Sequence, residues 1–199
     1  MRKVTHALFA LFATLTCTTV LAHSGNGTHL HTGFEAGFVH AMTGLDHVVV
    51  MLSVGLWSAL SARQLGREML WGPLGFTNML LVGTTLGLQG VEVPAVEPLI
   101  AASLVVTGML VVTKMQLQGV WAAAVAGLFA VFHGLAHGYE LADNAQAFQV
   151  LAGLVTATVL LHVTGLALGR MLRGAPVWVP RLIGAVVAIL GSTLLLPLN

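Results

Sequence analysis

Two clusters of ionisable side chains lie in apolar segments that otherwise contain almost no charge. An ionisable residue is costly to place in hydrocarbon, so its presence within a membrane segment indicates a functional site. Imidazole and carboxylate groups are also ligands of divalent transition metals. The ionisable members of the two clusters are His40, Asp46 and His47, followed by His133, His137 and Glu140.

The composition requires a membrane environment for these clusters. The chain has 199 residues, of which 57% are hydrophobic and only 8% charged, and its mean hydropathy is +0.92. This profile excludes a soluble domain and indicates a polytopic membrane protein. We predict an all-α bundle of six transmembrane helices, each near the ~20 residues that cross a bilayer. The expected spans are residues 34–60, 70–88, 95–113, 119–137, 147–168 and 177–196.

The N-terminus has the features of a cleavable signal peptide. Arg2 and Lys3 precede an apolar stretch at residues 8–21, and small residues favour cleavage after Ala22. An uncleaved first transmembrane helix is the alternative. Cleavage would remove Cys17, the single cysteine of the chain, and with it any thiolate metal ligand.

The distribution of charge predicts the orientation of the six spans. With the mature N-terminus outside, six basic residues fall in the three cytoplasmic connections, in agreement with the positive-inside rule. These residues are Arg63, Arg67, Lys114, Arg170, Arg173 and Arg181. The expected organisation is a signal peptide at 1–22, a periplasmic histidine-containing segment at 23–33 and a transmembrane domain at 34–199.

The first cluster does not form a chelate on a straight helix. His40 and His47 would share one face but lie about 10.5 Å apart along the axis, too far to bind one ion by themselves. Asp46 would point roughly 100° away and either orient a ring or face another helix. Gly44, on the histidine face, leaves room for an ion or another backbone.

The second cluster has chelating spacing. His133 and His137 are four residues apart, so both imidazoles can bind one cation, and Glu140 follows on the same face. The predicted topology places both clusters in the outer half of the membrane. We therefore expect them to converge around one cation path, with Glu140 and Glu97 at its outer mouth.

Other histidines leave alternatives open. The external segment carries His23, His29 and His31, which could capture metal before the pore or simply belong to a solvated tail. His162 could be a deeper relay ligand or a hydrogen-bonded core histidine. Ligands without thiolate suit Ni²⁺, Co²⁺ or Zn²⁺ and disfavour Cu(I), and spacing does not rank these three metals. Glycine pairs such as Gly83–Gly87 and Gly165–Gly169 predict close helix packing.

The two clusters resemble the sequence patterns of the HupE/UreJ family of nickel and cobalt transporters. The pattern His-x5-Asp-His is matched from His40 to His47, and Phe-His-Gly-x-Ala-His-Gly-x-Glu from Phe132 to Glu140. Ala41 stands where the family usually has proline, and the external segment is less histidine-rich than usual. The resemblance implies uptake of Ni²⁺ or Co²⁺ across a bacterial inner membrane.

We therefore predict a metal permease rather than an enzyme. The chain has no Gly-x4-Gly-Lys-Ser/Thr loop for nucleotide, so transport would follow a gradient or be coupled to protons. An intramembrane zinc-dependent hydrolase is the main alternative, although the second cluster lacks the glutamate of His-Glu-x-x-His. A bis-histidine haem protein is a third class. The expected partners are the metal cation and the lipid bilayer, with no prosthetic group and no nucleic acid.

Overall fold

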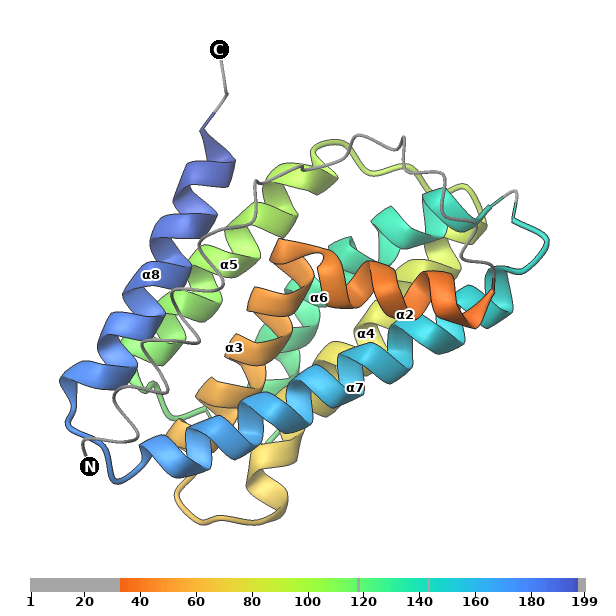
Figure 1. Ribbon diagram of the computed structural model, residues 1–199. Helices are drawn as coiled ribbons and strands as arrows, with labels where there is room; N and C mark the ends of the chain where they lie inside the picture. Colours follow the sequence, from red (N-terminus) through yellow and green to blue (C-terminus); the bar gives the residue numbers. More distant parts are fainter. Residues whose placement is uncertain (1–32, 118, 143, 197–199) are drawn as a thin grey trace. The chain divides into compact units, whose positions relative to one another are not determined.

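The computed structural model describes residues 33–117, 119–142 and 144–196, which belong to one compact unit, His31–Asn199. Within these residues the secondary structure is entirely helical, as predicted (Figure 1). The predicted signal peptide and almost all of the external segment lie outside the described residues. The helices are α2 (Phe34–Thr43), α3 (Leu45–Ser61), the 3-10 helix η1 (Arg67–Leu70), α4 (Trp71–Leu88), α5 (Val96–Thr113), α6 (Val120–Leu141), α7 (Ala147–Leu172) and α8 (Trp178–Leu195).

The expected first span is divided in two. Helices α2 and α3 meet at Gly44 with a bend of 77°, so the expectation of one straight helix is wrong. Gly44 has φ −65° and ψ 114°, which other residues can also adopt. Space is the stronger reason for glycine here, because an added Cβ would lie 2.9 Å from His47 Nδ1 and 3.3 Å from Asp46 Oδ1.

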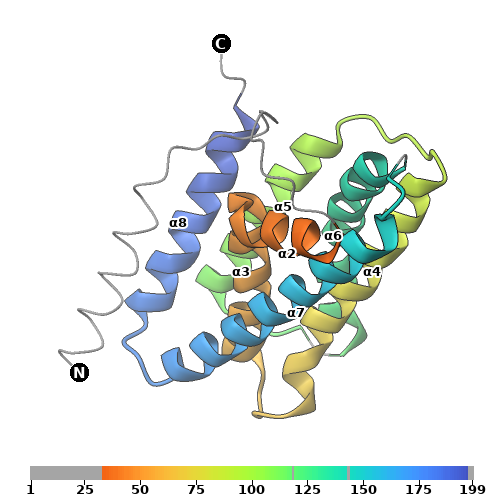
Figure 2. The ribbon, with the colours of Figure 1, turned by 45° about the vertical axis from the view of Figure 1, so that its right-hand side comes forward.

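Glycines allow several helix pairs to pack backbone against backbone. Helix α4 lies along α6, α3 along α7, and α5 along α8 (Figures 1 and 2). A methyl group at Gly83 would overlap the carbonyl of Val131 on α6, and one at Gly165 would overlap the carbonyl of Leu52 on α3. These contacts confirm the packing predicted from glycine spacing.

Helix α3 is the central element of the bundle. It contacts α2, α4, α5, α7 and α8, and every residue from Val50 to Ser61 except Leu52 is buried. The core around it includes Met51, Val54 and Phe76, all with no exposed surface. Most side chains of α3 from Val50 onwards are therefore surrounded by protein rather than by lipid.

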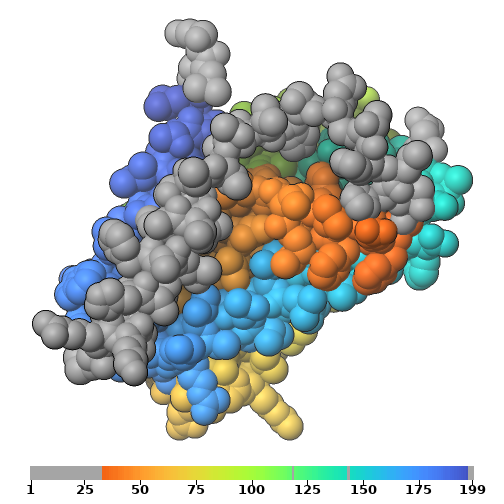
Figure 3. Space-filling model, in the orientation of Figure 1, coloured from red at the N-terminus to blue at the C-terminus, as the bar shows by residue number. Residues whose placement is uncertain are grey.

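The helices support a multi-pass membrane protein. Among the described residues, α5, α6, α7 and α8 are long and apolar enough to cross a membrane, and the bent pair α2–α3 makes a fifth span if counted as one. Helix α4 is not in this group. Helices α7 and α8, which form much of the face in Figure 3, carry exposed apolar side chains such as Phe148, Met171 and Ile189. Such surfaces suit contact with lipid.

Candidate metal centre

His47 lies at the centre of the site. It is buried in the first turn of α3, where Asp46 Oδ1 accepts a hydrogen bond of 2.9 Å from its Nδ1–H. This bond fixes the tautomer and leaves Nε2 as the atom available to a metal. His47 Nε2 lies 2.6 Å from His137 Nε2 of α6, so the two imidazoles share one hydrogen bond across ninety residues of sequence.

The bend at Gly44 brings His40 into the same cluster. Its ring centroid lies 5.3 Å from that of His47 and 5.1 Å from that of His137. A straight helix would instead separate His40 and His47 by about 10.5 Å along its axis. The break in the first span is therefore the feature that makes these two histidines neighbours.

His133 presents an unpartnered ring nitrogen to the cluster. The hydroxyl of Ser103 on α5 donates its single proton to the Ile100 carbonyl at 2.6 Å, so it accepts the 3.0 Å hydrogen bond from His133 Nε2–H. His133 Nδ1 then carries a lone pair. This atom is fully buried and has no hydrogen-bond partner among the described residues. The ring lies 5.5 Å from that of His47.

These side chains form two overlapping sets of potential ligands. One set contains His40, His47 and His137, and the other contains Asp46, His47 and His133. Within each set the ligand atoms lie no more than 4.8 Å apart. Both sets contain His47, so the two positions are adjacent.

The remaining predicted residues lie around or away from the cluster. Glu140 is half-exposed, and its Oε2 lies 3.6 Å from His137 Nδ1, an ion pair when that ring is protonated. Glu97 is exposed in the first turn of α5 and belongs to neither ligand set. His162 is buried on α7 and packs against Phe76, with ring centroids 5.2 Å apart. His23, His29 and His31 lie outside the described residues.

Sequence reasoning missed two neighbours of the cluster. Ser103 orients His133, and Phe76 packs between His133 and His162, with ring centroids 5.7 Å and 5.2 Å from theirs. A single serine or phenylalanine in an apolar helix carries no distinctive spacing. Only the packing of α4, α5 and α6 shows that these two residues contact the histidines.

The match to a known family includes both clusters. The sequence model of the HupE / UreJ protein family matches residues 11–194. The chain belongs to the HupE/UreJ family. This is a transporter family related to nickel and cobalt. A curated relative, Protein HupE of Rhizobium leguminosarum bv. viciae, is 38% identical over 177 residues, covering 88% of this chain and 90% of the relative. No solved structure matches the chain.

Proposed function

We propose that this HupE/UreJ protein is a permease that imports Ni²⁺ or Co²⁺ across the bacterial inner membrane. The convergence of the two clusters carries this proposal. His47 and His137 come from distant segments, are both buried, and meet with their Nε2 atoms 2.6 Å apart. The family supports transport as the activity and both metals as candidates.

The arrangement can accept a cation with small adjustments. Metal–imidazole bonds are about 2.1 Å long, so neighbouring nitrogens around a metal lie roughly 3 Å apart. The ligand atoms of each set already lie within 4.8 Å of one another. Because both sets use His47, we propose that one cation moves from the set with His40 to the set with Asp46 and His133.

The proposed topology has six spans. The bent pair α2–α3 forms the first, and α4 forms the one that composition alone does not support. In this arrangement the metal cluster and Glu140 lie towards the periplasm, as does the mature N-terminus. His23, His29 and His31 would then collect metal before it reaches the cluster.

Metal uptake by proteoliposomes tests the proposal directly. Radioactive Ni²⁺ or Co²⁺ uptake should fall at least tenfold in the His47→Ala, His133→Ala and His137→Ala variants, because each removes a ligand in a site shielded from water. His162→Ala serves as the matched control, since it removes a buried histidine outside both ligand sets. Protein abundance is measured in each preparation.

Two outcomes would contradict the permease. Parent protein that carries neither metal would reject transport, and a peptide- or ester-hydrolysis assay with Zn²⁺ would then test the hydrolase alternative. Normal uptake by well-expressed His133→Ala and His137→Ala variants would show that the cluster lies off the route. No observation on the described residues favours the hydrolase.

A further inference from the structure

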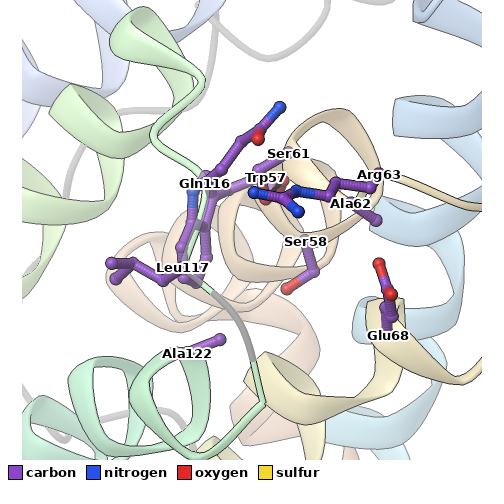
Figure 4. A pocket seen from close by; sticks show the side chains of 9 residues that line it. All are labelled: Trp57, Ser58, Ser61, Ala62, Arg63, Glu68, Gln116, Leu117 and Ala122. Atoms are coloured by element: carbon purple, nitrogen blue, oxygen red, sulfur yellow. Dashed lines mark hydrogen bonds between the residues drawn. The ribbon is translucent and has the colours of Figure 1, made fainter.

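A cavity lies at the end of α3 opposite the metal cluster. We call it the inner cavity, because this end of α3 faces the cytoplasm in the proposed topology. Trp57 is ten residues beyond His47, which corresponds to about 15 Å along the helix. The cavity lies between the end of α3, η1 and the α5–α6 connection (Figure 4). It is lined by Trp57, Ser58, Ser61, Ala62, Arg63, Glu68, Gln116, Leu117 and Ala122.

This cavity contains oxygen atoms suited to a cation. Glu68 supplies a carboxylate from η1, Ser58 supplies a hydroxyl from α3, and Gln116 supplies an amide. The Ser58 hydroxyl is buried and has no hydrogen-bond partner among the described residues. A buried polar atom without a partner is costly, so a ligand or water at this position would stabilise it.

A second, apolar cavity lies between this inner cavity and the metal cluster. Its lining includes Val54 and Trp57 of α3, Phe76 of α4 and Phe129 of α6. Phe76 also packs against the His133 ring, with centroids 5.7 Å apart. The second cavity is therefore bordered by Phe76, which packs on the metal cluster, and by Trp57, which also lines the inner cavity.

One face of helix α3 carries a stripe of residues that borders the metal cluster, the apolar cavity and the inner cavity. Residues of this stripe recur every three or four positions, which places them on one helix face. In order, these residues are His47, Val50, Val54, Trp57 and Ser61. The first belongs to the metal cluster, the next two line the apolar cavity, Trp57 lines both cavities, and Ser61 lines the inner cavity.

Helices α5 and α6 also line this route, and we call the contact between α3, α5 and α6 the seam. On α6, His133 is followed towards the inner cavity by Phe129, Ala126 and Ala122, again at helical spacing. On α5, Ser103 contacts His133, and Thr107 and Leu110 line the apolar cavity. The seam between α3, α5 and α6 thus runs from the metal cluster to the inner cavity.

Trp57 separates the two cavities. It is 1% exposed, and its indole N–H donates a 2.9 Å hydrogen bond to the Met115 carbonyl in the α5–α6 connection. Each cavity leaves only about 10 Å³, room for roughly one water molecule. A cation cannot pass Trp57 in this conformation, so passage requires the ring to move and its hydrogen bond to break.

We propose that the inner cavity is the release site for the transported cation and that Trp57 is the gate in front of it. This inference rests on the proposed permease function. Carboxylate, hydroxyl and amide oxygens bind nickel or cobalt less strongly than imidazole does. The guanidinium of Arg63 also lines the cavity and opposes retention of a second positive charge. A weak site after a strong one favours release over storage.

Cysteine labelling tests the release site. In a Cys17→Ser background, which removes the chain's single cysteine, Ser58→Cys places a thiol at the unpartnered hydroxyl. A membrane-impermeant cationic thiol reagent should modify it during transport in inside-out vesicles but not in right-side-out vesicles. Modification should lower metal transport in the import direction, measured as release from preloaded inside-out vesicles, at least tenfold relative to the same unlabelled variant. Val177→Cys, an exposed position before α8, is the matched control whose labelling should leave this transport unchanged.

A second variant tests the gate. Trp57→Phe keeps an aromatic ring but loses the hydrogen bond to the α5–α6 connection. In this variant the rate at which Ser58→Cys is labelled from the inner side should be unchanged. Labelling of Val54→Cys, which lies beyond the gate, should become at least tenfold faster. Unchanged labelling at Val54 overturns the gate. Ser58→Cys that resists labelling from both sides, or that is labelled without loss of transport, overturns the release site. Absent uptake by the parent protein would instead reject the permease itself.

Discussion

The contact between α4 and α6 should control the geometry of the metal cluster, although it contains no ligand. Gly138 follows His137 and packs against α4. An added Cβ at Gly138 would lie 2.5 Å from the Thr84 carbonyl oxygen and 2.6 Å from the Gly87 Cα, which are backbone atoms that cannot rotate away. Ordinary carbon contacts begin near 3.5 Å, so Gly138→Ala should displace α6 by roughly 1 Å.

That displacement is several times what a metal site tolerates. Metal–ligand distances are held within about 0.2 Å, and His133 and His137 both move with α6, whereas His47 stays on α3. We expect Gly138→Ala to lower Ni²⁺ or Co²⁺ affinity at least ~100-fold, which corresponds to about 2.7 kcal/mol. Overpacking costs about 1–3 kcal/mol, and the better helix propensity of alanine offsets about 1 kcal/mol of it.

Gly127→Ala is the matched control on the same helix. Its added Cβ would lie 2.7 Å from Met79 Cγ, the flexible part of a side chain, and 3.2 Å from the Gly75 carbonyl oxygen. Both variants gain the same helix propensity, so they differ mainly in what the methyl group meets. Isothermal titration of purified protein gives the affinities, and thermal unfolding gives the stabilities. Parent-like metal affinity in folded Gly138→Ala would refute the argument that this contact positions the histidines.

Three further substitutions probe individual contacts. Asp46→Asn should weaken metal binding about 10- to 100-fold in titrations, because Asp46 orients the His47 ring and loss of such a partner has that effect; a change below threefold would count against it. Tyr139→Phe removes two hydrogen bonds to the α4–α5 connection, at 2.9 Å and 2.7 Å, and should speed amide exchange there while α8 stays unchanged. His162→Phe should raise the melting temperature and preserve uptake, since both buried ring nitrogens lack a partner among the described residues; lost uptake would place His162 on the route.

Helix positions were largely predictable from the sequence, because the thickness of the bilayer sets the length of each apolar span and leaves charged residues to the connections between spans. Observed α4, α5 and α8 begin and end within a residue of the expected spans, and α6 extends beyond its expected end at His137 to include Glu140. The spacing of His133 and His137 predicted one shared cation, but the structure divides the pair between two ligand sets, with His137 beside His40 and His47 and His133 beside Asp46 and His47. That α4 crosses the membrane, and with it the count of six spans, remains a prediction.

The bend at Gly44 could not be predicted in the same way. A glycine in an apolar segment is equally compatible with a straight, closely packed helix. Position 41, where the family usually has a proline that would indicate a kink, is an alanine. The space that Gly44 leaves is used by His47 Nδ1 and Asp46 Oδ1, both from the next turn. His47 in turn is held by His137 of α6. The break therefore depends on long-range contacts that helical periodicity does not express.

In the proposed permease, the 77° angle between α2 and α3 would also determine where a cation loses its water. Two helices at this angle cannot both follow the membrane normal, so with α3 upright α2 lies nearly along the membrane surface. The 17 residues of α3 then cover about 25 Å, and His47, its third residue, lies within about 5 Å of the outer end. We expect dehydration to occur in stages at this elbow, with imidazoles replacing waters one at a time near the interface. The cation would thus enter the apolar seam already coordinated.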